Sequence, residues 1–397
     1  ADAAVAKAQA KQEAAKQKAA RSGKASPCEV VVELPGAAHG AIGLRDGSLA
    51  VLAGTDVVFV DPQGQVTATV GVNTEEYDQF FAGASGLCEL ADGRVLAYQE
   101  LTDSLRICAR ADGPATSWDP PGERSTGCVG SIAAWGDGFI ARTASVLYLD
   151  DGHGTVHACA PWGRDDFLRG AAPWRDGVLV WTSESTAFVD AGGQVRWRAA
   201  GGEACVCSDD AILVKSDSDV VGVDAQGAVL QRIAISRFGS RAPVVDGDAL
   251  VPTWRNGVAR VSPRAAEPRW EARRVLQVMR PAVVRLGGPR LAVYAEPPFV
   301  VNKDTTVAVL DLNDGTELSR VDAKAEVLGL VPLGEDGFGL WVDGRSTSKR
   351  IAVFGGLPSR PRRRNLDGHT GPVRGLLPRP DGRLASWGDR TLRIWRV

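Results

Sequence analysis

Residues 368–395 read GHTGPVRGLLPRPDGRLASWGDRTLRIW, and this stretch contains the pattern that recurs along most of the chain. An apolar run leads into the pair Asp381–Gly382, an alternating strand follows the pair, and a further strand follows that. Asp-Gly pairs tolerate positive φ and close tight hairpins between neighbouring strands. The stretch therefore predicts a set of short antiparallel strands.

The same kind of turn occurs nine times after Pro27. The pairs are Asp46–Gly47, Asp92–Gly93, Asp137–Gly138, Asp176–Gly177, Asp209–Asp210, Asp246–Gly247, Gly287–Gly288, Asp336–Gly337 and Asp381–Gly382. They are spaced about 42 residues apart on average, which is the length of a four-stranded propeller blade. Strands that alternate with such turns, without a helical period after Pro27, predict an all-β fold.

We predict a single β-propeller of four-stranded blades over residues 28–397, with nine blades. Eight blades is the alternative, if two units merge or if the last unit begins a second propeller. The last unit ends at Val397, directly after its third strand, and residues 28–34 form a strand before the first unit. Placing that N-terminal strand as the fourth strand of the last blade closes the ring and leaves it no open edge.

Residues 1–27 differ in composition from the propeller. Ala, Lys and Gln dominate, and Val5 is the only large apolar side chain. Good helix formers without an apolar stripe predict a helical arm or linker, as a spacer to an upstream module, a basic handle for a partner, or a solvated tail. The chain begins with Ala1, so we expect that an upstream segment has been removed.

The bulk composition narrows the classes of function. The 397 residues include 46 Lys+Arg and 48 Asp+Glu, a formal net charge of -2, which argues against nucleic-acid binding through bulk charge. Seven cysteines, thinly spread and odd in number, argue against a disulfide framework and favour a reducing compartment, so we expect the protein to be cytoplasmic. No stretch approaches the ~20 apolar residues that a membrane span needs.

The last unit resembles a WD-repeat blade. Gly368–His369, the hairpin Pro380-Asp381-Gly382 and the strand ending in Trp395 carry the resemblance. It implies that His369, Ser386, Asp389 and Trp395 form the buried hydrogen-bonded set of that family, with a structural role. The other eight units lack the paired Gly-His, so the close match covers one unit and the similarity of architecture covers residues 28–397.

Connectors between blades supply the candidate binding residues. Three of them, 73–81, 118–121 and 162–167, are rich in aromatic side chains, and unit seven adds an insertion at 294–299. Connectors of WD-repeat propellers share one face, and Trp, Tyr and Arg are frequent anchors of interfaces. The alternative is that the aromatic side chains cover seams between blades. The predicted partner-binding residues are Tyr77, Phe80, Phe81, Trp118, Trp162, Arg164, Phe167, Tyr294 and Phe299.

We predict no catalytic residue, no cofactor and no metal site. His153, His157 and Cys159 are candidate metal ligands without an evident fourth. The prediction is a non-enzymatic protein-interaction scaffold with protein partners. One alternative is an enzyme or small-molecule binder that uses the central channel. The other is a nucleic-acid-associated scaffold that uses the basic run at 360–364, which we otherwise place on the outer edge of unit eight.

Overall fold

The structure is a computed structural model that describes residues 28–72, 85–99, 105–119, 129–162, 167–216, 219–235, 242–253, 257–276, 281–295, 305–343, 350–359 and 361–397. In these residues every regular element is a β-strand, which confirms the all-β prediction. The predicted helical arm at residues 1–27 lies outside the described residues. No helix among the described residues is long and apolar enough to cross a membrane.

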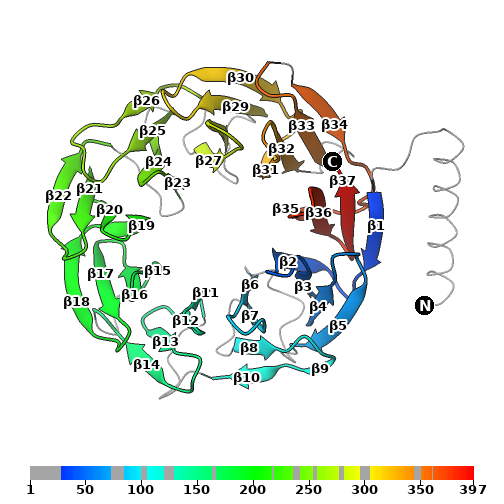
Figure 1. The fold of residues 1–397 in the computed structure, drawn as a ribbon, viewed down its shortest axis with the longest axis horizontal. Helices are drawn as coiled ribbons and strands as arrows, with labels where there is room; N and C mark the ends of the chain where they lie inside the picture. The colour runs from blue at the N-terminus through cyan, green and yellow to red at the C-terminus, as the bar shows by residue number, and fades with distance from the viewer. Residues whose placement is uncertain are drawn as a thin grey trace, which may run out of the picture.

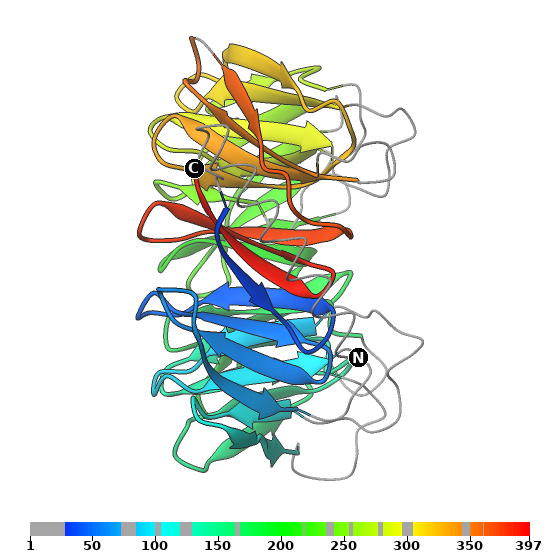
Figure 2. The same cartoon turned by 90° about the vertical axis from the view of Figure 1, so that its right-hand side faces the viewer.

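Nine sheets stand around a central axis and form a ring, shown face-on in Figure 1 and edge-on in Figure 2. Eight of the sheets have four strands and the first has five. We number them as blades 1 to 9 in chain order, so that blade 1 contains β2 and blade 9 contains β35. The predicted nine-bladed propeller is confirmed, and the alternative of eight blades is wrong.

Each blade runs from the axis to the outer wall in four strands (Figure 1). The innermost strands are β2 (Ala38–Gly43), β6 (Ser85–Glu89), β11 (Ser131–Trp135), β15 (Gly170–Trp174), β19 (Gly202–Ser208), β23 (Val244–Val245), β27 (Pro281–Arg285), β31 (Val327–Leu333) and β35 (Val373–Pro378). The second strands are β3 (Leu49–Ala53), β7 (Val95–Gln99), β12 (Gly138–Arg142), β16 (Gly177–Trp181), β20 (Ala211–Lys215), β24 (Asp248–Thr253), β28 (Arg290–Ala295), β32 (Gly337–Val342) and β36 (Arg383–Gly388).

The third strands are β4 (Asp56–Val60), β8 (Leu105–Cys108), β13 (Leu147–Asp150), β17 (Ser185–Asp190), β21 (Val220–Asp224), β25 (Gly257–Val261), β29 (Thr306–Asp311), β33 (Ile351–Gly355) and β37 (Thr391–Arg396). The outer strands are β5 (Val66–Gly71), β10 (Thr116–Trp118), β14 (Val156–Cys159), β18 (Val195–Ala200), β22 (Val229–Ile233), β26 (Trp270–Ala272), β30 (Glu317–Asp322), β34 (Arg362–Asn365) and β1 (Cys28–Glu33).

Burial follows the position of each strand in its blade. All five residues of β16 are buried, whereas residues of β18 alternate between half-buried and exposed. A middle strand has another blade against each face of its sheet, so both of its faces need apolar side chains. The cores accordingly lie between blades, as where Leu250 and Val258 of blade 6 pack with Leu291 of blade 7.

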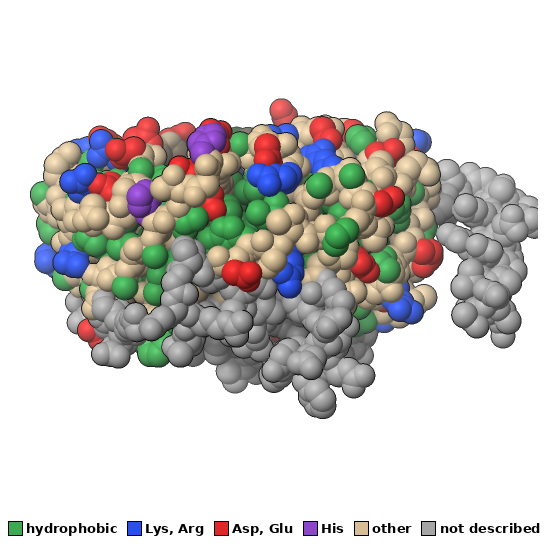
Figure 3. Space-filling model, turned by 90° about the horizontal axis from the view of Figure 1, so that it is seen from below, with side chains coloured by type: hydrophobic (Ala, Val, Ile, Leu, Met, Phe, Trp, Pro, Cys, Tyr) green, Lys and Arg blue, Asp and Glu red, His purple; other side chains and the backbone are tan. Residues whose placement is uncertain are grey.

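The predicted turns connect the innermost strand of each blade to the second. Their acidic side chains, such as Asp46, Asp137 and Asp176, are exposed. In one side view of the ring, Asp, Glu, Lys and Arg side chains gather along one rim, and hydrophobic side chains lie on the wall beneath it (Figure 3). We call the face that carries these hairpins the hairpin rim.

The ring closes by pairing the first strand with the last. β1 is antiparallel to β37, with Val30 opposite Ile394 and Val32 opposite Leu392, which confirms the predicted closure. On the hairpin rim, the guanidinium of Arg379 donates to the carbonyl of Pro62 at 2.8 Å and so joins blade 9 to blade 1. Because β37 pairs with β36 on one side and with β1 on the other, it has no open edge.

Blade 1 has a fifth strand that the sequence did not predict. β9 (Gly113–Pro114) belongs to the segment between β8 and β10 of blade 2, yet it pairs in parallel with β5 on the outer wall of blade 1. The carboxylate of Asp112 accepts a hydrogen bond from the Thr69 N–H at 2.8 Å and holds the segment there. This strap therefore links blades 1 and 2 outside their sheets.

Candidate functional site

Four of the nine predicted partner-binding residues lie in the part of the chain that the structure describes. Tyr77, Phe80, Phe81, Arg164 and Phe299 lie outside it. The other four, Trp118, Trp162, Phe167 and Tyr294, occupy three different settings.

Trp118 lies at the seam between blades 2 and 3. It ends strand β10, and its ring meets Phe139 and Tyr148 edge-on, with centroids 5.1 and 5.9 Å apart. Its Nε1–H donates to Asp150 Oδ2 at 2.9 Å. Both the face and the polar edge of the indole are used within the fold, which is the seam-covering arrangement that we considered as the alternative.

Trp162 and Phe167 flank one connector between blades 3 and 4. Trp162 is half-buried and packs against the core cluster that contains Ile140 and Leu168. Phe167 leaves 68% of its surface exposed, although Leu168 next to it is buried. The N–H of Leu168 donates to the Ala144 carbonyl at 2.6 Å. The exposed phenyl ring therefore projects from backbone that is tied to the rigid blade.

Tyr294 lies within strand β28 rather than in a connector. Only 9% of its surface is exposed, and it packs with Val307 and Leu340 between blades 7 and 8. A side chain in this position contributes to the core and has little area for a partner. The insertion predicted at 294–299 thus begins later than we expected, and we do not include Tyr294 in the proposed surface.

His369, Ser386, Asp389 and Trp395 lie together in blade 9. His369 Nε2 and Trp395 Nε1 contact Ser386 Oγ at 2.8 and 2.7 Å, and His369 Nδ1 lies 3.4 Å from Asp389 Oδ1. A neutral imidazole protonated on Nδ1 satisfies these contacts, because Ser386 then donates to Nε2 and His369 donates to Asp389. Ser386 lies in β36 and Trp395 in β37, whereas Asp389 lies in the turn between these strands and His369 in the connector that precedes β35.

The electrostatics of this network keep the imidazole neutral. The His369 side chain is 2% exposed, and burial lowers its pKa from 6.5 to about 4 against the opposing effect of Asp389. Arg393 and Arg350 lower the pKa further. Desolvation penalises the charged form of a histidine, so a positive charge here is disfavoured until the solution is acidic.

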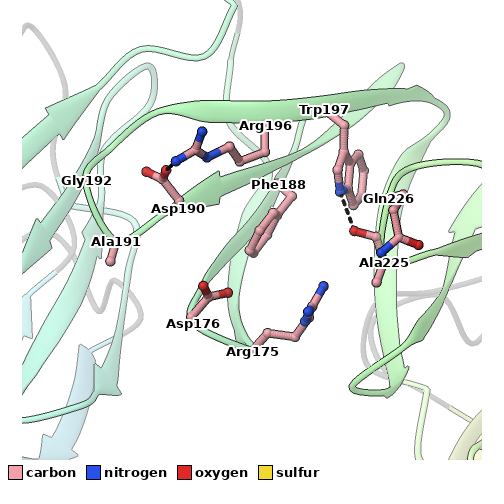
Figure 4. A pocket seen from close by; sticks show the side chains of 10 residues that line it. All are labelled: Arg175, Asp176, Phe188, Asp190, Ala191, Gly192, Arg196, Trp197, Ala225 and Gln226. Atoms are coloured by element: carbon pink, nitrogen blue, oxygen red, sulfur yellow. Dashed lines mark hydrogen bonds and ion pairs between the residues drawn. The ribbon is translucent and has the colours of Figure 1, made fainter.

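A pocket of about 530 Å³ opens on the hairpin rim at the seam of blades 4 and 5 (Figure 4). Phe188 and Trp197 form its aromatic wall, with their rings stacked at 6.1 Å. Trp197 Nε1–H donates to the Ala225 carbonyl at 3.1 Å, so the wall is fixed by blade 5. Four charged side chains line the pocket, namely Arg175, Asp176, Asp190 and Arg196.

Two of these charged side chains neutralise each other. Asp190 accepts a hydrogen bond from the Gln194 N–H at 2.8 Å and forms an ion pair with Arg196, and both contacts lower the pKa of Asp190. Sequence reasoning missed the pocket. The one available signal is that blade 4 reads Trp-Arg-Asp-Gly at 174–177 where blade 3 reads Trp-Gly-Asp-Gly at 135–138.

The basic run lies on the outer wall of blade 8. Strand β34 starts at Arg362, where we placed the outer edge of unit eight, and Arg360 is outside the described residues. Arg363 stacks on Phe354 with 5.9 Å between the guanidinium carbon and the ring centroid, and Arg364 donates to the Arg396 carbonyl. Among the described residues, no group of three or more His, Cys, Asp and Glu side chains is arranged to hold a metal ion.

Solved structures of similar fold belong to proteins with unlike roles. The C-terminal WD40 domain of Sif2 aligns with a TM-score of 0.50 at 10% identity over 93% of this chain and 99% of that chain. Sqt1 of Saccharomyces cerevisiae aligns with a TM-score of 0.54 at 7% identity over 94% and 99%. The dihydro-heme d1 dehydrogenase NirN aligns with a TM-score of 0.52 at 14% identity over 72% and 66%.

Comparison of the sequence with protein-family models and with curated proteins finds no match. The structural likeness confirms a WD-repeat-like propeller fold. It goes no further than the fold, because a WD40 domain and a dehydrogenase share it, and propellers host many unrelated functions.

Proposed function

We propose that the propeller is a non-enzymatic scaffold that binds a partner protein through the face that carries the connector after blade 3. The exposure of Phe167 is the observation that carries the proposal. A phenyl ring that is 68% exposed costs free energy in water, and burying it against a partner would recover that cost. Leu168, the neighbour of Phe167, is part of the core cluster between blades 3 and 4, so the backbone at Phe167 loses little conformational entropy on docking.

Among the large exposed hydrophobic side chains that the structure describes, Phe167 is the aromatic one. The others are Val66, Val229, Leu328 and Val397. Aromatic anchors contribute more to interfaces than aliphatic ones do. The connector residues outside the described part, Tyr77, Phe80, Phe81, Arg164 and Phe299, remain predictions for the same face.

The proposal is tested by site-specific photocrosslinking in lysate of the native host. A benzophenone amino acid at position 167 should give a discrete adduct, and the same amino acid at Val229, which is 53% exposed on outer strand β22, should not. Phe167→Ala should weaken binding of the protein that crosslinks at position 167 by about 2 kcal/mol, or roughly thirtyfold in Kd, without lowering Tm. Equal adducts at both positions, or unchanged capture by Phe167→Ala, would refute the proposal.

A further inference from the structure

The pocket on the hairpin rim of blades 4 and 5 contains a strained residue. Arg175 has φ = 55° in the hairpin that joins β15 to β16. The corresponding hairpin of blade 3 has Gly136 at this position, also with φ = 55°. Both hairpins are closed by equivalent pairs, Trp135 with Gly138 and Trp174 with Gly177. An arginine in this left-handed conformation is strained where glycine is not, and such residues often mark functional sites.

The strained backbone sets the guanidinium of Arg175 at the pocket. Its carbon lies 6.0 Å from the centroid of the Trp174 ring, and Trp174 is 2% exposed with its Nε1–H bonded to the Ser208 carbonyl at 2.8 Å. Stacking on a fixed indole restricts the guanidinium while leaving its N–H groups available. Within the described residues these N–H groups make no hydrogen bond and no ion pair.

The neighbouring Asp176 is also without a hydrogen bond or ion pair in the part of the chain that the structure describes. Figure 4 shows its carboxylate pointing toward Phe188, and it shows the Arg175 guanidinium on the other side, toward Ala225 and Gln226. Asp190 and Arg196, in contrast, pair with each other. Among the described residues that line it, the pocket therefore presents one unpaired cation and one unpaired anion beside an aromatic wall.

This combination matches the chemistry of a peptide chain end. A planar guanidinium binds a carboxylate through two parallel hydrogen bonds. A carboxylate alone would be repelled by Asp176, so the ligand must also carry an N–H donor close to its carboxylate. The last residue of a peptide has its main-chain N–H a few atoms from its α-carboxylate. An apolar side chain on that residue would pack on Phe188 and Trp197, within the volume typical of ligand sites.

We propose that this pocket binds the carboxyl-terminal residue of a peptide, with an apolar or aromatic side chain at that residue. The α-carboxylate pairs with Arg175, the main-chain N–H donates to Asp176, and the side chain packs on the Phe188–Trp197 wall. The site is independent of the surface proposed around Phe167. Phe167 precedes β15 and Arg175 follows it, so the two sites lie at opposite ends of that strand.

Isothermal titration calorimetry of the full chain tests the proposal with three probes. These are N-acetyl-alanyl-phenylalanine with a free carboxylate, the same dipeptide as its carboxamide, and N-acetyl-glutamate amide, which carries only a side-chain carboxylate. The free acid is expected to bind in the millimolar range or tighter. The other two probes should bind about tenfold or more weakly, because loss of a hydrogen bond to a charged group typically has that effect.

Two variants locate the binding. Arg175→Gly installs the residue that blade 3 uses, so it should abolish binding of the free acid while Tm does not fall. Asp176→Ala should weaken binding, and Arg232→Gln, an exposed arginine on outer strand β22, is the matched control that should bind as the parent does. No binding of the free acid at millimolar concentration, equal binding of the carboxamide or of N-acetyl-glutamate amide, or full binding by Arg175→Gly would each overturn the proposal.

Discussion

The buried imidazole of His369 should make the stability of the propeller depend on pH. Its pKa in the folded protein is about 4, below the 6.5 of an unperturbed histidine, because the ring is buried in blade 9. Between these two values the unfolded chain binds a proton that the folded chain does not. The unfolding free energy is therefore highest above pH 6.5. It falls progressively as the pH decreases through 6.5 toward 4, because the unfolded chain then takes up a proton on His369 that the folded chain does not.

The size of the effect follows from the two pKa values. Lowering the pH from 7 to 5 should remove about 2 kcal/mol of unfolding free energy through His369 alone, and lowering it to 4 should remove about 3 kcal/mol. The side chain is 2% exposed, so solvent screening reduces these values little. Such a loss is a large part of the stability of an ordinary domain.

Urea unfolding followed by tryptophan fluorescence at pH 7 and pH 5 measures this effect when the parent is compared with His369→Gln. The variant keeps a polar side chain but has no titration at this site, and the other three histidines are common to both proteins. The advantage of the parent over the variant should shrink by about 2 kcal/mol between pH 7 and pH 5. A difference that is the same at both pH values would refute the assignment of a buried, neutral His369.

Three further predictions concern the framework. A Cβ on Gly375 would lie 2.2 Å from Trp387 Cζ2, so Gly375→Ala should lower the unfolding free energy measured in urea by about 1–3 kcal/mol. A Cβ on Gly355 meets no atom within 4 Å, so Gly355→Ala is the control and should change the unfolding free energy little. Equal effects of the two substitutions would contradict this packing. Asp248 is 2% exposed and forms ion pairs with Arg260 and Arg269 at 2.8 and 2.6 Å, so Asp248→Ala should lower the unfolding free energy by about 3–5 kcal/mol because it leaves the buried Arg260 charge unpaired. The double variant Asp248→Ala/Arg260→Met should recover part of this loss. No recovery would contradict the role of an unpaired charge. Removal of residues 28–34 should expose the edge of β37 and produce oligomers in size-exclusion chromatography with light scattering, and a monomer of unchanged Tm would rule out the closing role of β1.

Most of the fold was predictable because its signals are local. A hairpin turn such as Asp137–Gly138 depends on a few consecutive residues, and nine turns, seven of them Asp-Gly, predicted nine blades. The closing strand was predictable from a missing partner, since the last unit ended after its third strand. Strand β9 was not predictable, because Gly113 and Pro114 carry no strand signal and pair only where blade 1 happens to offer an edge.

The candidate sites were less predictable, because exposure depends on neighbours that are distant in sequence. Trp118 and Phe167 are both aromatic residues next to connectors, and the sequence treats them alike. Phe139 and Tyr148 of the next blade cover Trp118, whereas Phe167 remains 68% exposed. The sequence suggested that Tyr294 begins a connector, but Tyr294 lies within strand β28, where residues of blade 8 help to bury it.

The sequence by itself therefore determined the four-stranded blades, their hairpins and the strand that closes the ring, because hairpin turns and strand alternation are properties of a few consecutive residues. It favoured nine blades and left eight as an alternative, which the structure excluded. Only the tertiary structure decided which charged and aromatic side chains remain available for binding. The pocket shows the reason: Arg175 and Phe188 come from blade 4, Ala225 comes from blade 5, and their chemistry is combined only when the two blades pack together.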